Sequence, residues 1–163
     1  MMPLPIEALT GAAFAAFGEV IEPEAATRVY PINEATALRY HALARVDCAA
    51  EQGRPVISWV RAQARVLPFE VRVLERHPLG SQAFVPLSAA AYLVVVAATP
   101  AAVPRVFLAE RGQGVNFHRG TWHHPLLALE KNCDFLVVDR EGPGDNCEEV
   151  ALARTFRIEH WSS

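Results

Sequence analysis

Histidines gather in one short stretch of this chain. Gly112 to Pro125 reads G-Q-G-V-N-F-H-R-G-T-W-H-H-P and holds three of the six histidines, which are His118, His123 and His124. Imidazole can act as acid, base or metal ligand near neutral pH, because its unperturbed pKa is about 6.5. The stretch lies between apolar segments that resemble strands. It therefore predicts one half of an active site.

A second stretch with unusual polar residues lies upstream. Leu74 to Leu87 reads L-E-R-H-P-L-G-S-Q-A-F-V-P-L. Glu75 and His77 are two residues apart, so at the end of a strand their side chains point to the same face. Gln82 follows after a Pro-Leu-Gly turn. We expect this stretch to lie opposite the histidine-rich one and to complete the site.

The elements that carry these residues are predicted to be mostly β. Apolar and polar residues alternate at 56–65 and 69–75, as in half-buried strands. Shorter strands are expected at 20–23, 83–86, 92–97, 106–109, 126–129, 135–139 and 156–158. The polar segment 24–38 is expected to be a loop. Frequent proline and glycine between the strands indicate a barrel or a sandwich.

One helix is expected, near the N-terminus. Apolar residues recur at helical spacing from Ile6 to Phe17, which predicts a short helix near 7–16 that ends before Gly18. The length of 163 residues predicts a single domain over 1–163.

Composition limits the partners and the compartment. The net charge is −3 and no basic run occurs, so we expect neither nucleic acid nor a membrane as a partner. Three cysteines without a CxxC pair favour free thiols in a reducing cytoplasm. The N-terminus lacks the pattern of a signal peptide, and the longest apolar run, from residue 89 to 98, is too short to span a bilayer.

The histidine-rich stretch resembles the second motif of cupin-type barrels, G-x5-P-x-G-x2-H-x3-N. Gly112, Gly120 and His123 match it. His118 stands in the proline place, and Leu127 stands where asparagine is expected.

The upstream stretch resembles the first cupin motif, G-x5-H-x-H-x3-4-E-x6-G, with changes. Glu75, His77 and Gln82 stand at its three ligand places, and Phe69 and Ala89 replace its glycines. Together the two motifs imply a mainly β, cupin-like (RmlC-type) antiparallel β-barrel with a short N-terminal helix. They also imply a metal site whose candidate ligands are Glu75, His77, Gln82 and His123.

A narrower resemblance covers much of the chain. The sequence is similar to the ureidoglycolate lyases of allantoin and purine catabolism in six strings that keep their order, at 39–41, 61–63, 74–84, 114–126, 134–140 and 145–147. The resemblance implies a homodimeric cytoplasmic enzyme that converts (S)-ureidoglycolate to glyoxylate and urea. It also implies a divalent metal cofactor, with nickel as the expected ion. Mixed imidazole and oxygen donors suit such an ion, whereas structural zinc sites usually include cysteine.

The implied reaction needs three kinds of group. A base removes the hydroxyl proton, an acid protonates the departing nitrogen, and a cation holds the carboxylate. We expect the catalytic groups to be Glu75, His77, His118 and His123. Arginine suits the carboxylate because its planar fork binds both oxygens. The expected substrate-binding residues are Arg61, Arg76, Gln82, Asn116, Arg119 and His124.

Two other functions compete with this interpretation. The same pocket could hydrolyse the ureido group with release of ammonia, or the barrel could bind a small carboxylate without catalysis. Simpler structural roles are also expected for several polar residues. His124 is predicted to lie outside the ligand set, behind His123 or at an interface, and Asp134, Asp139 and Arg140 to form a structural ion pair at a strand end.

Overall fold

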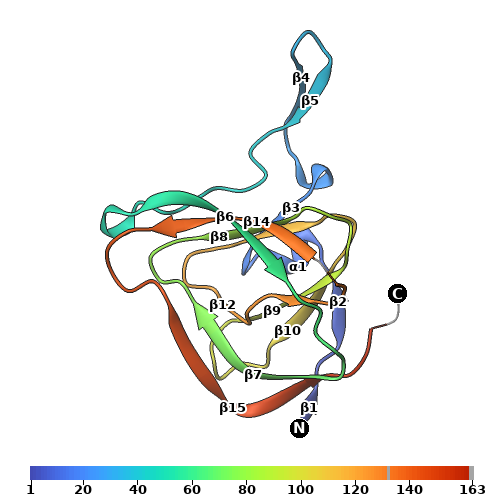
Figure 1. Cartoon of the computed structure of the whole chain (residues 1–163), viewed down its shortest axis with the longest axis vertical. Coiled ribbons are helices and arrows are strands. Elements are labelled where there is room, and N and C mark those ends of the chain that lie inside the picture. The colour runs from blue at the N-terminus through green and yellow to red at the C-terminus, as the bar shows by residue number, and fades with distance from the viewer. Residues whose placement is uncertain (132, 162–163) are drawn as a thin grey trace.

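The chain folds into a curled, mainly β structure with one short helix, in a computed structural model that describes residues 1–131 and 133–161 (Figure 1). The expected domain, 1–163, includes residues 132, 162 and 163, which lie outside the described residues. The predicted class, a cupin-like β-barrel with a short N-terminal helix, is confirmed. None of the described helices is long and apolar enough to cross a membrane.

Two curled sheets form the walls of the barrel. The larger sheet has the order β1 (Met2–Pro3), β15 (Glu148–Ile158), β7 (Phe69–Arg76), β12 (Trp122–His123), β9 (Tyr92–Ala97), β10 (Arg105–Ala109) and β2 (Ile6–Ala8), with β13 (Leu127–Ala128) also paired to β9. The smaller sheet has the order β3 (Gly18–Ile21), β11 (Gly114–Phe117), β8 (Gln82–Pro86), β14 (Cys133–Glu141) and β6 (Arg54–Ala62). Pairing within the walls is antiparallel, except that β1 and β2 run parallel to β15 and β10.

Strand β9 is buried on both faces and separates two apolar clusters. Its residues Tyr92, Val94 and Val96 belong to the cluster inside the barrel, which includes Phe107 and Phe135. The alternate residues of β9 belong to a second cluster between the larger sheet and the chain ends. This double burial explains why β9 reads as a continuous apolar run in the sequence.

The N-terminal helix is shorter than predicted. Helix α1 spans only Gly11–Phe14, and Thr10 caps it by accepting a hydrogen bond from the backbone N–H of Ala13. Residues 7 and 8, expected to be helical, belong to β2, which pairs with β10. The spacing of apolar residues there is compatible with a helix or a strand. Pairing with the free edge of β10 favours the strand.

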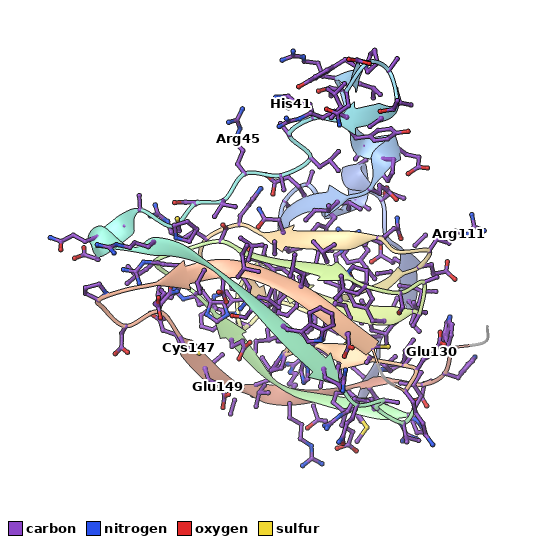
Figure 2. All side chains as sticks on the ribbon, turned by 45° about the horizontal axis from the view of Figure 1, so that its top comes forward. His41, Arg45, Arg111, Glu130, Cys147 and Glu149 are labelled. Carbon is purple, nitrogen blue, oxygen red and sulfur yellow. The ribbon has the colours of Figure 1, made fainter. Side chains whose placement is uncertain are left out.

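The predicted loop at 24–38 holds a hairpin that the sequence analysis missed. After a short 3₁₀ turn, η1 (Pro23–Ala25), strands β4 (Val29–Ile32) and β5 (Ala37–Tyr40) pair and project from the barrel as an arm (Figure 1). His41 lies at the base of the arm, and Arg45 lies on the segment that returns to the barrel (Figure 2). That segment includes a second 3₁₀ turn, η2 (Ala50–Gln52). The arm turns through Asn33, which has a positive φ.

The close approach of β3 and β11 gives a prediction about stability. A Cβ added at Gly18 would overlap the backbone carbonyl oxygen of Asn116, whereas one at Gly11 would meet nothing within 4 Å. Gly18→Ala should therefore force the two strands apart and cost about 1–3 kcal/mol or more. Thermal denaturation should show a loss in Tm of at least about 2–4 °C. Gly11→Ala is the matched control, and an equal loss in both variants would contradict this packing.

Candidate active site

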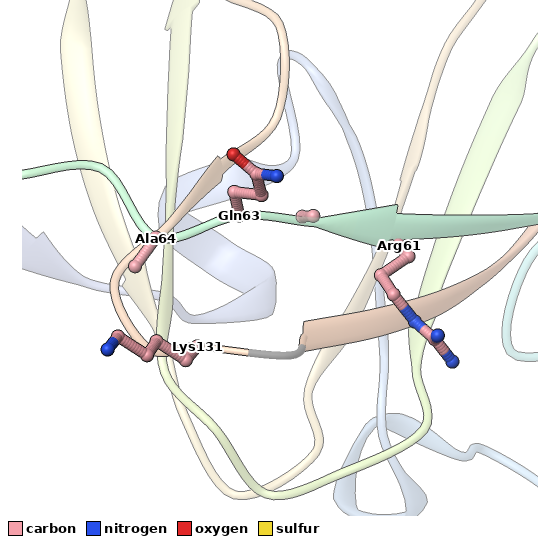
Figure 3. Close-up of a pocket in the computed structure, with 5 residues that line it drawn as sticks. Arg61, Gln63, Ala64 and Lys131 are labelled. Atoms are coloured by element: carbon pink, nitrogen blue, oxygen red, sulfur yellow. The ribbon is translucent and has the colours of Figure 1, made fainter.

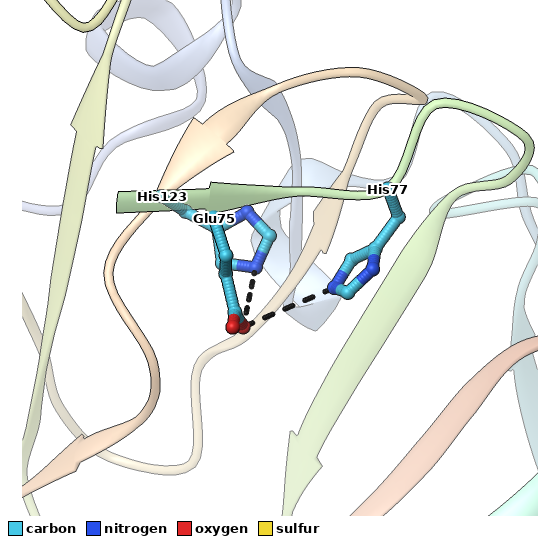
Figure 4. A group of neighbouring side chains, drawn as sticks. All are labelled: Glu75, His77 and His123. Atoms are coloured by element: carbon cyan, nitrogen blue, oxygen red, sulfur yellow. Dashed lines mark ion pairs between the residues drawn. The ribbon is translucent and has the colours of Figure 1, made fainter. Parts of the chain in front are cut away.

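Three predicted site residues converge at one end of the barrel. Glu75 on β7 pairs directly with His123 on β12, so both side chains point to the same face of the sheet, and His77 follows the end of β7 (Figure 4). Glu75 Oε1 lies 3.5 Å from His123 Nε2 and 3.9 Å from His77 Nε2. Among the described residues, this trio is the one group of three histidine, cysteine or acidic side chains whose ligand atoms all lie within 4.8 Å of one another. The structure thus brings together three of the residues that the sequence spacing predicts for the site.

Backbone carbonyls fix the orientation of both imidazoles. His77 Nδ1 lies 2.7 Å from the carbonyl oxygen of Asn146, and His123 Nδ1 lies 2.9 Å from that of Thr121. A carbonyl can only accept, so each Nδ1 carries the proton and donates it. In the neutral form of each imidazole, Nε2 then carries the lone pair, on the side of Glu75. This is the tautomer that a metal-binding or basic histidine requires.

The carboxylate of Glu75 is suited to stay ionised. Its polar contact with His123 lowers the pKa of Glu75, and the nearby charges of the histidines lower it further, while partial burial acts in the opposite direction. The site thus combines one carboxylate with two imidazole nitrogens.

Gln82 supplies a further oxygen. It begins β8, opposite Phe117 on β11, and the ring of Phe117 stacks on that of His123 with centroids 4.2 Å apart. Its Nε2 donates to Asp139, and its Oε1 is buried without a hydrogen-bond partner. Gln82 therefore offers an unused carbonyl oxygen beside the histidines.

The donor set fits a divalent cation. Four buried side-chain atoms in the described part of the chain have no hydrogen-bond partner, and three of them are His77 Nε2, His123 Nε2 and Gln82 Oε1. Unpartnered buried polar atoms are costly, so their concentration at one place indicates a missing ligand. Two imidazole nitrogens, one carboxylate and one amide oxygen suit nickel or a similar ion. Of the four predicted ligands, Glu75, His77 and His123 form a group that could hold a metal ion.

The hollow inside the barrel is too small for an organic substrate. Glu75, His123 and His124 line it together with apolar side chains such as Tyr92 and Leu126, and its volume is about 20 Å³. This volume is enough for about one water molecule. The side chains of Glu75 and His77 keep 21% and 16% of their surface exposed. A substrate must therefore approach from the rim where these two residues lie.

Two predicted residues of the histidine-rich stretch lie apart from the trio. Asn116 alternates with the inward-facing Val115 and Phe117, so it points to the outer face of its sheet, where it donates to Glu19 and to the carbonyl of Arg45. His118 Nε2 lies 3.3 Å from the same Glu19 carboxylate. These contacts form a second polar group at the rim. Glu19, which is not among the predicted site residues, contacts both Asn116 and His118.

The three predicted arginines bind acidic partners of their own. Arg61 makes a two-pronged contact with Asp134 on the outer face of β6, beside an open pocket of about 590 Å³ lined also by Gln63 and Lys131 (Figure 3). Arg76 points away from the neighbouring Glu75, binds Glu148 and stacks over Trp122.

Arg119 lies 3.6 Å from Asp47, and both side chains are about half exposed. It belongs to the turn at 118–121, in which the backbone N–H of Gly120 donates to the carbonyl of His77. Arg119 therefore lies next to a residue whose backbone is hydrogen-bonded to His77.

His124 is buried behind the trio. It packs edge-on against Phe69, and its Nδ1 lies 2.8 Å from the carbonyl of Pro125. Burial lowers the pKa of His124. It lines the same hollow as His123 and, as predicted, lies outside the trio.

The predicted ion pair among Asp134, Asp139 and Arg140 is wrong. Asp134 binds Arg61, Asp139 binds Gln82, and Arg140 donates to the backbone carbonyls of Ala50, Glu51 and Pro143. Side chains alternate along β14, so the neighbouring Asp139 and Arg140 point to opposite faces.

Comparison with known proteins identifies the family of the chain. The family model described as ureidoglycolate lyase matches residues 1–159. A ureidoglycolate lyase of Burkholderia mallei is 54% identical over 159 residues, which cover 96% of this chain and 93% of that protein. Those of Burkholderia cepacia and Pseudomonas putida are each 50% identical and cover 96% and 91% of this chain, and 90% and 91% of their own lengths. This chain belongs to the ureidoglycolate lyase family.

Proposed function

We propose that this protein is a ureidoglycolate lyase that cleaves (S)-ureidoglycolate to glyoxylate and urea in the breakdown of allantoin and purines. The observation that carries the proposal is the convergence of Glu75, His77 and His123, with the Nε2 atoms of both histidines directed to one carboxylate. Family membership and the names of the relatives support the choice of substrate.

The reaction is an elimination that needs two proton transfers. The substrate carbon carries a carboxylate, a hydroxyl and the ureido nitrogen. Removal of the hydroxyl proton lets the C–O bond become the carbonyl of glyoxylate while the C–N bond breaks. The departing nitrogen takes up a proton and leaves as urea. No water is consumed and no covalent intermediate with the protein is required.

We propose that the trio carries out these transfers. An imidazole with a free Nε2 and an ionised carboxylate can each accept the hydroxyl proton, and the resulting imidazolium can return a proton to nitrogen. His77 and Glu75 lie at the accessible rim, whereas His123 is only 2% exposed. The predicted catalytic His118 lies with Glu19 outside the trio, and we propose that it acts at the rim instead.

We propose Arg119 as the group that holds the substrate carboxylate. Its turn is joined to His77 through Gly120, and its exposed pair with Asp47 is of the weak kind that another anion can replace. Gln82, Asn116 and His124 complete the proposed set around the rim and the hollow. Arg61 and Arg76 face away from the trio, with carboxylates already bound to them.

We propose a divalent cation, nickel in the first instance, held by Glu75, His77, Gln82 and His123. Such an ion would act as a Lewis acid that lowers the pKa of the substrate hydroxyl, and a trio atom that holds the ion would not at the same time accept the proton. The protein's own contribution is to hold the two imidazoles in the ligand tautomer and to keep bulk water out of the hollow.

Product analysis tests the reaction itself. Purified protein incubated with (S)-ureidoglycolate, with and without added Ni²⁺, should form glyoxylate and urea in equal amounts and release no ammonium. Enzymatic assays for urea and ammonium separate the lyase from an amidohydrolase. A protein that forms no glyoxylate under either condition is not a lyase, and binding without turnover would favour a small-carboxylate-binding barrel.

Histidine substitutions test the proposed division of roles. His123→Ala should lower kcat by about 10²–10⁴-fold, because it removes the Nε2 that serves as a metal ligand or, without the ion, as a proton-transfer group. His118→Ala should leave most of kcat and change mainly KM, since its contact is with Glu19. The exposed His160 provides the control His160→Ala. Steady-state kinetics would exclude this assignment if His118→Ala were as damaged as His123→Ala.

We propose that two copies pair through the outer face of the smaller sheet and work in the cytoplasm. Edge strand β6 exposes Ile57 and Trp59 on this face at 68% and 62% of their surfaces. The arm also exposes apolar side chains, among them Leu38 and Tyr40. Exposed apolar patches mark interaction surfaces, and a lone two-stranded hairpin is marginally stable without a surface to pack on. A second copy would cover both features.

Charge placed on this face should separate the subunits. In sedimentation velocity, the unaltered protein should run as a dimer and Trp59→Asp as a monomer, because burial of the new carboxylate is costly. Val66, 82% exposed in the loop after β6, gives the control Val66→Asp, which should stay dimeric. If Trp59→Asp remains a dimer, the subunits pair through another surface.

A further inference from the structure

Asp139 contacts the metal-site residue Gln82 and has no part in the reaction described so far. Gln82 Nε2 donates to Asp139 Oδ2 over 3.1 Å. The pairing of β8 with β14 ends at Val138 and Ala83, and Asp139 and Gln82 are the next residues along the two strands. By alternation, their side chains share the inner face of the sheet with Val137 and Phe84. Asp139 therefore lies next to Gln82 inside the barrel wall.

The contact determines which end of the Gln82 amide faces the histidines. An amide has a donor end and an acceptor end of nearly equal size, so it can turn over at little steric cost. An ionised carboxylate accepts hydrogen bonds only, and Asp139 therefore attracts the NH₂ end. Strand β8 lies between β14 and β11. With NH₂ held toward β14, the carbonyl oxygen points toward β11, whose Phe117 stacks on His123.

The unpartnered oxygen supports this interpretation. Gln82 Oε1 is buried and accepts no hydrogen bond, although burial of an unpaired carbonyl is unfavourable. Asp139 thus holds the amide in an orientation that leaves its oxygen without a hydrogen bond. Such an arrangement is useful where the oxygen binds a ligand. A turned amide would instead present hydrogens, which repel a cation.

We propose that Asp139 is a positioning residue that holds the amide of Gln82 with its carbonyl oxygen toward Glu75, His77 and His123. Its function is to keep an oxygen ligand available for the divalent cation before the ion arrives. The proposal rests on the metal site of the proposed function. It assigns Asp139 an effect on ion affinity that acts entirely through Gln82.

Asp139→Asn removes the preference for the NH₂ end of the Gln82 amide, with almost no change in the shape of the side chain at 139. The new amide can donate to Gln82 Oε1, so the Gln82 side chain is free to turn over. Isothermal titration with Ni²⁺ should show a loss of affinity of about 10–100-fold, the usual effect of removing a group that orients a ligand. Thermal denaturation of the metal-free protein should change little, while the rise in Tm on adding Ni²⁺ should shrink.

A double-mutant cycle separates orientation from simple charge. In a Gln82→Ala background there is no amide to orient, so Asp139→Asn should change Ni²⁺ affinity by no more than about twofold, the error with which independent substitutions add. Loss of a negative charge near the ion would instead weaken binding equally in both backgrounds. Coupling between the two sites is therefore the signature of a positioning role.

Three results would overturn the proposal. These are unchanged Ni²⁺ affinity in Asp139→Asn, equal losses in both backgrounds, and unchanged affinity in Gln82→Ala. If the unaltered protein binds no Ni²⁺ and still forms urea and glyoxylate, the metal site and this inference both fail while the lyase function stands. If it binds Ni²⁺ with the predicted coupling but forms no product, the inference stands and the proposed reaction fails.

Discussion

The pairing of Glu75 with His123 is the contact on which the site depends. Strand β12 is only two residues long, and it is held between β7 on one side and the fully buried β9 on the other. The register places His123 beside Glu75 and Val96, so all three point to the same face. A slip of one residue in β7 would turn Glu75 outward and bring Arg76 into the apolar interior. The packing of β9 therefore controls the chemistry of a neighbouring strand.

The barrel tolerates polar side chains in its interior because most of their hydrogen bonds are made by backbone. Carbonyls of Asn146 and Thr121 satisfy one nitrogen of each imidazole, and Asp139 satisfies one end of Gln82. What is left over is a small set of acceptors directed to one place. Burial of such groups without a partner costs free energy that the apolar clusters around them must offset. The unpaired atoms thus lower the stability of the fold, but they remain available to bind a ligand.

The sequence was sufficient to predict those parts of the site that depend on alternation or on motif spacing. Glu75 and His77 were found because they are two residues apart at a strand end, and alternation alone could also have placed Arg76 on the opposite face. The carbonyl partners of the histidines gave no signal, because any residue type supplies a carbonyl. The arm was not predicted because Pro31 and Asn33 are residue types that are typical of loops. The positive φ angles near Asn33 are visible only in the structure. The register between strands of the smaller sheet, which brings Gln82 to Phe117 and Asp139, depends on contacts far apart in the chain.

Strand β7, which carries Glu75, lies between β12 and β15, and β1 in turn lies along β15. The neighbour of the catalytic strand is therefore the last strand of the described chain, and the first strand is attached to it. During synthesis on the ribosome, the wall that holds Glu75 stays open until residues 148–158 have emerged. Pairings over such sequence separations form late and slowly. The histidines and the carboxylate should consequently come together only near the end of folding. A nascent chain therefore contains these residues before they form a site.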